Sequence, residues 1–379
     1  MIFRVICYTA PEYILKKGLI TIQAALLIII GILLFELIIL SHEFGHFICA
    51  KKSGVLVHEF ALGMGPKIFG FKKGETQYSF RLFPLGGYCK MEGEDEESDN
   101  PRAFGKAKLW QRMIIIVAGA FNNILLGLVL MCVLVVQEPV YASTTIESFH
   151  ENAKSSAQGL QAGDTLASID GYAIYTARDF SFSLATMKTD SPDIQVYRDG
   201  QLKDLGNIKF DTTTDSSGRK YIQLDFYVKP IEKNIGTVIT QTFQQTYSVV
   251  RMIWASLIGL VTGQFSMNDI SGPIGAAGAI TEATSMGLET SFLNGLNNLI
   301  FMMMVISVNL GIFNMLPIPA LDGGRFFFLL IEAVRRKPIP PKYEGVVHTV
   351  GFLILIAFMI LISFKDVMRL FSGEGFSGG

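Results

Sequence analysis

The chain has 379 residues, of which 50% are hydrophobic and only 17% are charged, and its formal net charge is −1. This balance is typical of membrane proteins, and the near-zero net charge excludes the basic surface that nucleic-acid binding requires. The four cysteines form no CxxC pair, so they predict neither a disulfide framework nor a thiolate zinc knuckle.

The first predicted membrane span covers residues 19–50. Its stretch from Leu19 to Leu40 is almost entirely apolar, and about 20 such residues cross a bilayer. This stretch is too long for the core of a signal peptide, so we do not expect it to be cleaved off. A short amphiphilic lead over residues 1–18 precedes it.

An HExxH motif, His42-Glu43-x-x-His46, ends this apolar run. Residues four apart share one helix face, so both imidazoles can reach one metal ion. Zinc binds imidazole nitrogen readily, and Glu43 is close enough to take a proton from a water molecule there. Each ionisable group in a span costs about 2.5–3.5 kcal/mol on insertion scales, so three at metal-ligand spacing favour a zinc site over packing.

Two further residues of this span have open interpretations. Glu36 lies seven residues before Glu43 and therefore nearly on the same helix face. It either lines a wet cavity that leads to the metal or pairs with a polar group on a neighbouring helix. Cys49 follows His46 by three residues, and a ligand role is conceivable, but close packing between helices explains it better.

Residues 51–109 form a polar, glycine-rich connection that contains a predicted β-hairpin over 64–83. Its turn is Lys72-Lys73-Gly74-Glu75, which separates two segments rich in aromatic residues. The following Leu85-Gly86-Gly87-Tyr88 allows the chain to bend sharply. The acidic run over 94–99 predicts a solvated loop.

The second predicted span covers residues 110–137 and contains Gly119 and Asn123, four residues apart. Small and amide residues at this spacing permit close helix contact and a hydrogen bond between helices. Helix packing is therefore the default interpretation, although the amide of Asn123 could also reach into the metal site.

Residues 138–230 are soluble in character and predict one compact, strand-rich domain. A turn at Gly159–Asp164 precedes a strand, and the segments 194–197 and 221–224 alternate as strands do. The region 231–290 is predicted to lie on the membrane surface. Within it, apolar residues recur every three to four positions over 237–263, which indicates an amphipathic helix that lies on the membrane rather than crossing it.

Residues 264–290 are rich in Gly, Ser and Thr, and 271–275 predicts a loop. The third span covers 293–316 and the fourth 346–364. Between them, Pro317 and Pro319 cannot continue a helix, and irregular backbone at membrane depth is tolerated only inside protein or beside water.

Asp322, which follows these prolines, is the best candidate for a third metal ligand. The alternative, equal on spacing alone, is a cap for a helix over 325–334.

Basic residues in short loops predict the orientation. The 51–112 connection carries eleven Lys or Arg residues and the 325–342 connection carries five, so both should be cytoplasmic. The region 138–290 and both chain termini would then lie outside. Lys16 and Lys17 argue mildly against this orientation.

Taken together, the motifs resemble the site-2 protease family (peptidase M50) of intramembrane zinc metalloproteases. The resemblance is narrower to the bacterial branch typified by the regulator of sigma-E protease, which has an extracytoplasmic PDZ domain. It covers nearly the whole chain and rests on His42–His46, Phe83–Tyr88, Gly119-x-x-x-Asn123, the Gly159–Asp164 turn, Ser271-Gly272-Pro273 and Asn314-x-x-Pro317-x-Pro319-x-Leu321-Asp322-Gly323.

The resemblance implies a polytopic α-helical membrane protein of the bacterial cytoplasmic membrane. It would have four transmembrane helices, a membrane-associated β-hairpin and an extracytoplasmic β-rich PDZ domain. Residues 1–137 and 291–379 would be the two halves of the protease core. The domain over 138–230 and the surface region over 231–290 would screen substrates by size, and the hairpin would pair with an extended substrate strand.

The site residues follow from the same resemblance: Zn²⁺ would be bound by His42, His46 and Asp322, water would be activated by Glu43, and the substrate backbone or oxyanion would be contacted by Asn123 and Asn314. The substrates would be single-span membrane proteins such as anti-sigma factors, remnant signal peptides or pheromone precursors. Two departures are visible, because Ala120 stands where the family usually has proline and a single PDZ domain is expected where some relatives carry two.

Two other functions compete with this one. A membrane receptor without catalysis would capture peptides with the PDZ domain, but the intact Glu43 argues against it. A metal transporter usually shows repeated halves and several polar spans, which this sequence lacks.

Overall fold

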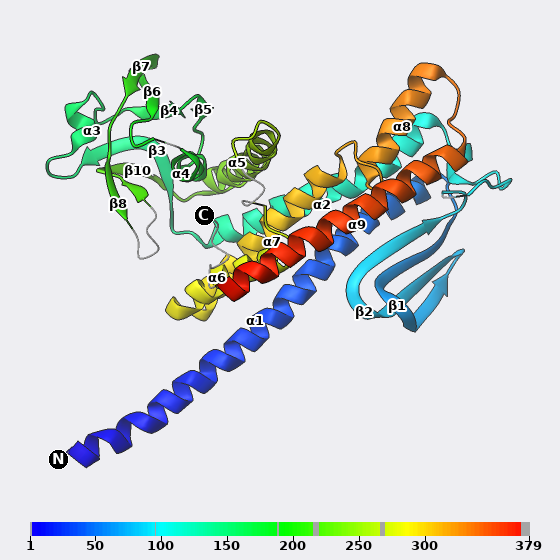
Figure 1. Ribbon diagram of the computed structural model, residues 1–379, viewed down its shortest axis with the longest axis horizontal. Coiled ribbons are helices and arrows are strands. Elements are labelled where there is room, and N and C mark those ends of the chain that lie inside the picture. The colour runs from blue at the N-terminus through cyan, green and yellow to red at the C-terminus, as the bar shows by residue number, and fades with distance from the viewer. Residues whose placement is uncertain (1, 95, 188, 215–219, 266–269, 373–379) are drawn as a thin grey trace. The chain divides into compact units, whose positions relative to one another are not determined.

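The structure, a computed structural model, describes residues 2–94, 96–187, 189–214, 220–265 and 270–372. The chain divides into two compact units. We call Met1–Leu130 with Thr262–Gly379 the membrane unit and Met131–Val261 the β unit. Most of the helices belong to the first unit and most of the strands to the second (Figure 1).

Within the described residues, four helices are long and apolar enough to cross a membrane: α1 (Ile2–Lys52), α2 (Leu109–Gln137), α7 (Phe292–Asn314) and α9 (Pro341–Ser372). The four predicted spans are therefore confirmed, and the fold is that of a multi-pass membrane protein. Helix α1 runs without a break through the predicted amphiphilic lead.

Helices α1 and α2 approach each other closely where glycine leaves room. A Cβ atom on Gly45 would lie 2.2 Å from the carbonyl oxygen of Ala118, so only glycine fits there. Around this contact, Ala50, Ile115 and Ile116 are buried in one hydrophobic cluster. The end of α1 that carries the HExxH motif is thereby fixed against the middle of α2.

The described part of the membrane unit contains three further, shorter helices: η1 (Phe104–Lys106), α6 (Pro273–Thr290) and α8 (Asp322–Arg335). The loop predicted over 271–275 is wrong from Pro273 onward, because proline suits the first turn of a helix. The buried Asp366 of α9 accepts hydrogen bonds from the backbone N–H groups of Gly272 and Gly275, at 2.9 and 2.8 Å. It thus satisfies donors that a helix start leaves without partners.

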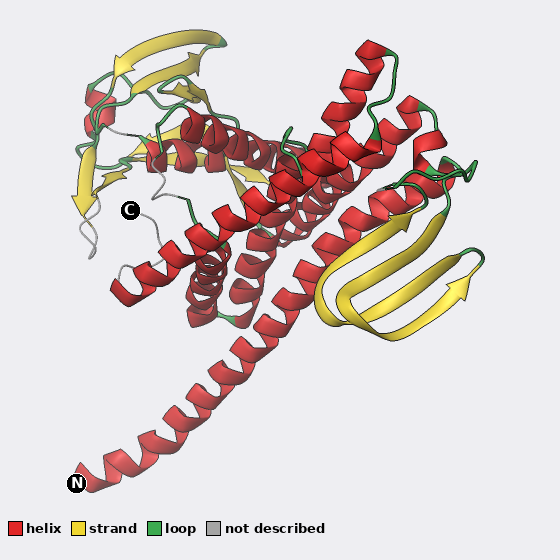
Figure 2. Ribbon diagram, turned by 45° about the vertical axis from the view of Figure 1, so that its right-hand side comes forward, coloured by secondary structure: helices red, strands yellow, loops and turns green. Residues whose placement is uncertain are grey.

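The predicted hairpin is confirmed and is longer than expected, with strands β1 (Val57–Lys73) and β2 (Thr76–Met91). Gly74 takes a φ of 64° in the turn. Each strand bends back on itself, so that Phe60 of β1 pairs with both Tyr78 and Cys89 of β2. The result is a small curved sheet, which we call the β element (Figure 2).

The β unit contains an antiparallel sheet of order β10-β3-β4-β6-β7, with β5 paired to β4 and a separate β8-β9 pair. The strand bounds are β3 Val140–Phe149, β4 Thr165–Ile169, β5 Tyr172–Ala173, β6 Asp193–Arg198, β7 Gln201–Asn207, β8 Asp211–Thr214, β9 Lys220–Gln223 and β10 Phe226–Glu232. The strands expected over 194–197 and 221–224 fall on β6 and β9. The core includes Ile146, Leu166, Ile194 and Phe226, all buried.

Among its described residues, the β unit has three helices: α3 (Lys154–Ala157), α4 (Ala177–Thr186) and α5 (Ile235–Val261). The amphipathic helix predicted over 237–263 is α5. The fully buried Asp179 of α4 accepts hydrogen bonds from Ser248 and Arg251 of α5, at 2.6 and 3.1 Å. The opposite face of α5 exposes a row of large apolar side chains: Ile235, Ile239, Phe243, Tyr247, Trp254, Ile258 and Val261.

Candidate metal centre

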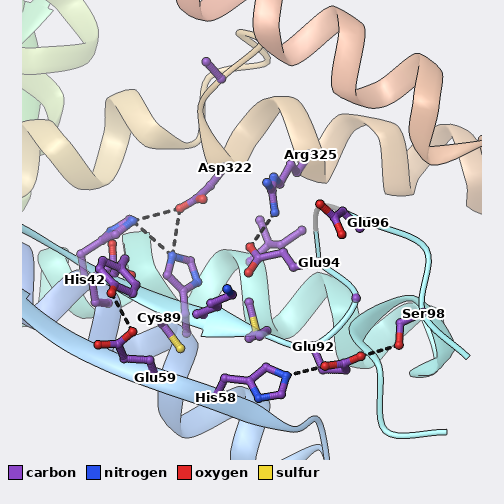
Figure 3. A pocket seen from close by; sticks show the side chains of 18 of the residues that line it. His42, His58, Glu59, Cys89, Glu92, Glu94, Glu96, Ser98, Asp322 and Arg325 are labelled. Atoms are coloured by element: carbon purple, nitrogen blue, oxygen red, sulfur yellow. Dashed lines mark hydrogen bonds and ion pairs between the residues drawn. The ribbon is translucent and has the colours of Figure 1, made fainter. Parts of the chain in front are cut away.

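Three side chains from distant parts of the chain converge on one point in the membrane unit. The Nε2 atoms of His42 and His46 on α1 lie 3.2 Å apart. The Oδ2 atom of Asp322 lies 3.0 Å from the first and 3.3 Å from the second (Figure 3). Among the described residues, this is the one group of three or more His, Cys, Asp or Glu side chains positioned to share a metal ion.

Asp322 is the first residue of α8, yet it does not cap that helix. Leu321 takes the N-cap position, and the side chain of Asp322 points to the imidazoles instead. Two glycines make the tight turn possible. A Cβ atom on Gly323 would lie 2.1 Å from the carbonyl oxygen of Leu316, and one on Gly324 would lie 2.5 Å from that of Ile318. The geometry thus favours the ligand interpretation of Asp322 over the helix cap.

Gly119 of α2 leaves the space that the two imidazoles occupy. A Cβ atom there would lie 2.4 Å from His46 Nε2 and 2.8 Å from His42 Cε1. The sequence interpretation, helix packing, missed this contact. The spacing of Gly119 one helical turn before Asn123 could have indicated this contact, because residues four apart share a helix face and Asn123 lies beside His42.

The outer nitrogens of both imidazoles are oriented by neighbours. His46 Nδ1 lies 2.8 Å from the carbonyl oxygen of Ile115 and donates to it, which leaves the Nε2 lone pair for a metal. His42 Nδ1 lies 3.4 Å from the amide nitrogen of the fully buried Asn123, whose Oδ1 has no hydrogen-bond partner. If the side-chain amide of Asn123 is flipped by 180°, its Oδ1 accepts a hydrogen bond from His42 Nδ1–H, and both of these atoms then have a partner.

This donor set fits zinc. Two imidazole nitrogens and one carboxylate oxygen are the protein ligands of a class of catalytic zinc sites that keep a position open for water. The hydrogen-bonded outer nitrogens are the support that metal-bound imidazoles normally have. Cys49 is not among the converging side chains, so the described residues give no support for it as a ligand.

A cavity of about 1070 Å³ adjoins the centre and is lined by both imidazoles, Asp322 and Glu43. Strand β2 passes beside Glu43, because a Cβ atom on Gly87 would lie 3.6 Å from Glu43 Cγ. Further carboxylates line the same cavity: Glu59, Glu92, Glu94, Glu96 and Glu97. These polar walls allow water to reach the centre, and Glu43 is placed to act on it.

The acidic run over 94–99 is only partly the solvated loop that the sequence predicts. Glu96 and Glu97 are exposed, whereas Glu94 forms an ion pair with Arg325 of α8 at 2.5 Å. Asp95 lies outside the described residues. The loop therefore contacts the helix that carries Asp322.

Asn314 and Glu36, two other residues singled out in the sequence, have different surroundings. Asn314 ends α7, and its amide nitrogen lies 3.3 Å from His42 Nε2, so it belongs to the centre. Glu36 is 7% exposed, and neither oxygen of its carboxylate has a hydrogen-bond partner among the described residues. It is not among the residues that line the cavity, and no polar partner on a neighbouring helix is seen for it in the described part of the chain, so neither interpretation of Glu36 is supported.

Groups of the β element beside the cavity have shifted pKa values. Burial raises the pKa of the Cys89 thiol, and the nearby carboxylates of Glu43 and Glu94 raise it further. Burial, together with a hydrogen bond to Glu59, raises the pKa of Tyr88 to about 12. Both side chains therefore stay protonated and neutral at physiological pH.

Comparison with known proteins gives a consistent result. Residues 30–358 match the model of peptidase family M50. A protein of Clostridium acetobutylicum is 36% identical over 344 residues, which cover 90% of this chain and 97% of that protein. Zinc metalloprotease RasP of Geobacillus kaustophilus is 30% identical over 429 residues, covering 91% and 98%. Regulator of sigma-W protease RasP of Bacillus subtilis is 28% identical over 426 residues, covering 91% and 99%.

Proposed function

This chain belongs to peptidase family M50 and is an intramembrane zinc metalloprotease, and we propose that it cleaves peptide bonds in or near the transmembrane segments of single-span membrane proteins. The main support is the convergence of His42, His46 and Asp322 beside Glu43, on helices long enough to cross a bilayer. A centre carried by such helices lies where a transmembrane segment of a substrate can meet it.

In this proposal His42, His46 and Asp322 hold the zinc ion and Glu43 is the general base. A bound zinc ion supplies Lewis acidity, which polarises a carbonyl and lowers the pKa of a water molecule. Glu43 then takes the proton of the attacking water on a carboxylate oxygen and passes it to the leaving amine nitrogen. Strand β2 passes beside this side chain at Gly87.

We assign Asn123 and Asn314 to substrate binding. Both amides lie next to His42, from α2 and from the end of α7. An amide N–H at this position can donate to a substrate carbonyl or to the oxyanion that forms during attack. Asn123 is fully buried and also supports His42, so its replacement should affect zinc affinity as well as turnover.

A transmembrane substrate must unwind before cleavage, because its peptide groups are engaged in helical hydrogen bonds. We propose that the β element holds the unwound segment as an added strand. Its strand β2 runs past Glu43, as the close approach of Gly87 to that side chain shows, and this supports the role. Stiffening a substrate helix with Leu or Ala should slow its cleavage, and an unchanged rate would contradict the proposal.

The β unit is proposed to be a PDZ domain on the extracytoplasmic side, with α5 lying on the membrane surface. The exposed apolar row of α5 supports this, since an amphipathic helix binds at the interface with such a face. Together they would screen substrates by size. One relative is named a regulator of sigma-W protease. We propose to test anti-sigma factors and remnant signal peptides first as substrates.

The deciding experiment compares the parent protein with Glu43→Gln, using co-expressed single-span substrates. We expect the variant to keep its zinc and lose cleavage, while Glu282→Gln, which changes an exposed carboxylate on α6, leaves both unchanged. Cleavage by Glu43→Gln would remove Glu43 from the mechanism. A zinc-loaded parent that cleaves none of the substrates would favour the receptor function.

A further inference from the structure

The turn that delivers Asp322 to the metal centre contains an unfavourable backbone conformation. Ala320 has a φ of 78°, in the left-handed region that an L-residue with a Cβ atom adopts at an energetic cost. It lies two residues before Asp322 and directly after Pro319. Such a conformation persists only where the surroundings hold it.

Helix α9 supplies two contacts that hold this turn. The backbone N–H of Ala320 donates a hydrogen bond of 2.9 Å to Nδ1 of His348. One turn further along α9, a Cβ atom on Gly351 would lie 2.3 Å from Cβ of Pro319 and 2.9 Å from its carbonyl oxygen. Residues three apart share a helix face, so one face of α9 both contacts the turn closely and hydrogen-bonds to it.

The surroundings of His348 favour the form of the ring that can accept this bond. Because Nδ1 accepts, the proton of the neutral imidazole must sit on Nε2. Nε2 faces the carboxylate of Glu344, one helical turn earlier, at 3.8 Å. The ring of Phe328 on α8 lies 5.7 Å from the imidazole, so the same side chain also contacts the helix that Asp322 begins.

We propose that His348 is a positioning residue for the metal centre, which holds the Ala320 turn so that the Asp322 carboxylate meets the two imidazoles. No motif singles out this histidine, and it lies on the last membrane-spanning helix, away from the HExxH motif. Residues that contact a metal ligand but not the metal typically lower metal affinity by about 10- to 100-fold when they are removed. The inference rests on the proposed role of Asp322 as a ligand.

Three substitutions separate the hydrogen bond from simple packing. His348→Asn keeps an acceptor oxygen close to the place of Nδ1, His348→Gln carries its amide one bond further out, and His348→Ala has no acceptor. Zinc affinity is measured by competition with a chelator of known affinity. We expect the Ala and Gln variants to lose about 10- to 100-fold and the Asn variant to stay near the parent.

A second readout needs no metal. Hydrogen exchange of the peptide that contains Ala320 is followed in the metal-free protein. The Ala320 amide should exchange faster in His348→Ala and His348→Gln than in the parent, and His348→Asn should restore its protection. Equal affinities and exchange rates in all four proteins would overturn the proposal, as would equal impairment of the Asn and Ala variants.

The strain itself provides a further test and control. Glycine adopts a φ of 78° without the cost that alanine has. The double variant His348→Ala, Ala320→Gly should therefore regain part of the zinc affinity that His348→Ala loses, whereas a purely structural role in α9 packing would give no recovery. Asp322→Ala tests the underlying ligand assignment separately, because retained zinc there would refute that assignment without changing the exchange result at Ala320.

Discussion

Replacing Gly119 by alanine should weaken metal binding in a protein that otherwise folds. The new Cβ atom would lie 2.4 Å from His46 Nε2, whereas ordinary van der Waals contacts begin at 3.4 Å. The imidazole must therefore move away by about 1 Å. That atom is one of the proposed zinc ligands. The substitution therefore acts on the centre directly, although Gly119 has no side chain of its own.

The magnitude follows from two opposing effects. Alanine stabilises the interior of a helix by about 0.5–1 kcal/mol relative to glycine. Overpacking a filled site typically costs about 1–3 kcal/mol, and here the strain falls on ligand atoms that zinc needs in place. Since 1.4 kcal/mol corresponds to a factor of ten, we expect zinc affinity to fall by about 10- to 100-fold with little change in overall stability.

The assay is zinc content after dialysis against a chelator, combined with thermal unfolding of the metal-free protein. Gly345→Ala on α9 is the matched control, because no heavy atom lies within 4 Å of the Cβ position there. It should show the helix-propensity gain with unchanged zinc. If Gly119→Ala retained one zinc per chain and full cleavage, the packing argument for the centre would be refuted.

Three further predictions concern other parts of the membrane unit. Asp366→Ala should lower the free energy of unfolding by about 1–3 kcal/mol, because the backbone N–H groups of Gly272 and Gly275 lose their acceptor. Asp366→Asn keeps one acceptor oxygen and should lose less. Equal stability of the parent and both variants in thermal unfolding would contradict the capping role. Hydrogen bonds from Arg102 and then Lys51 lower the pKa of Glu75 to about 2 from 4.5. A lowered folded-state pKa stabilises the fold above pH 4.5, and this contribution is lost as the pH falls toward 2. Acid should therefore increase hydrogen exchange in the hairpin turn more in the parent than in Glu75→Gln. Identical pH profiles of exchange in the two proteins would contradict this prediction. Burial raises the pKa of the Cys89 thiol, so Cys89 should resist a thiol-alkylating reagent at pH 8 until the protein unfolds. Mass spectrometry of the labelled peptides measures this. Rapid labelling of Cys89 in the folded protein would contradict its burial.

The features that the sequence predicts well are local ones. The HExxH motif, the apolar spans and the hairpin turn at Gly74 each depend on residues close together in the chain. Periodicity and turn chemistry are sufficient for these. The amphipathic pattern of α5 likewise emerged from spacing alone, because one face of that helix packs against α4 and the other is exposed.

Other features depend on contacts between distant segments, which spacing cannot predict. By spacing alone Asp322 is an equally good helix cap, and its position 3.0 Å from His42 Nε2 becomes visible only in the fold. The small residues of α6 suggest a loop, yet Asp366 from the far end of the chain satisfies the first turn of a helix there. His348 belongs to no motif, and its contact with the turn becomes visible only in the fold.

The central claim is that two imidazoles and one carboxylate hold a zinc ion beside Glu43. Zinc K-edge X-ray absorption on the purified, zinc-loaded protein tests it most directly. The account predicts two imidazole nitrogens and oxygen ligands at about 2.0–2.2 Å, and no retained zinc in Asp322→Ala after the same loading. A sulfur ligand at about 2.3 Å, or a full complement of zinc in Asp322→Ala, would contradict it.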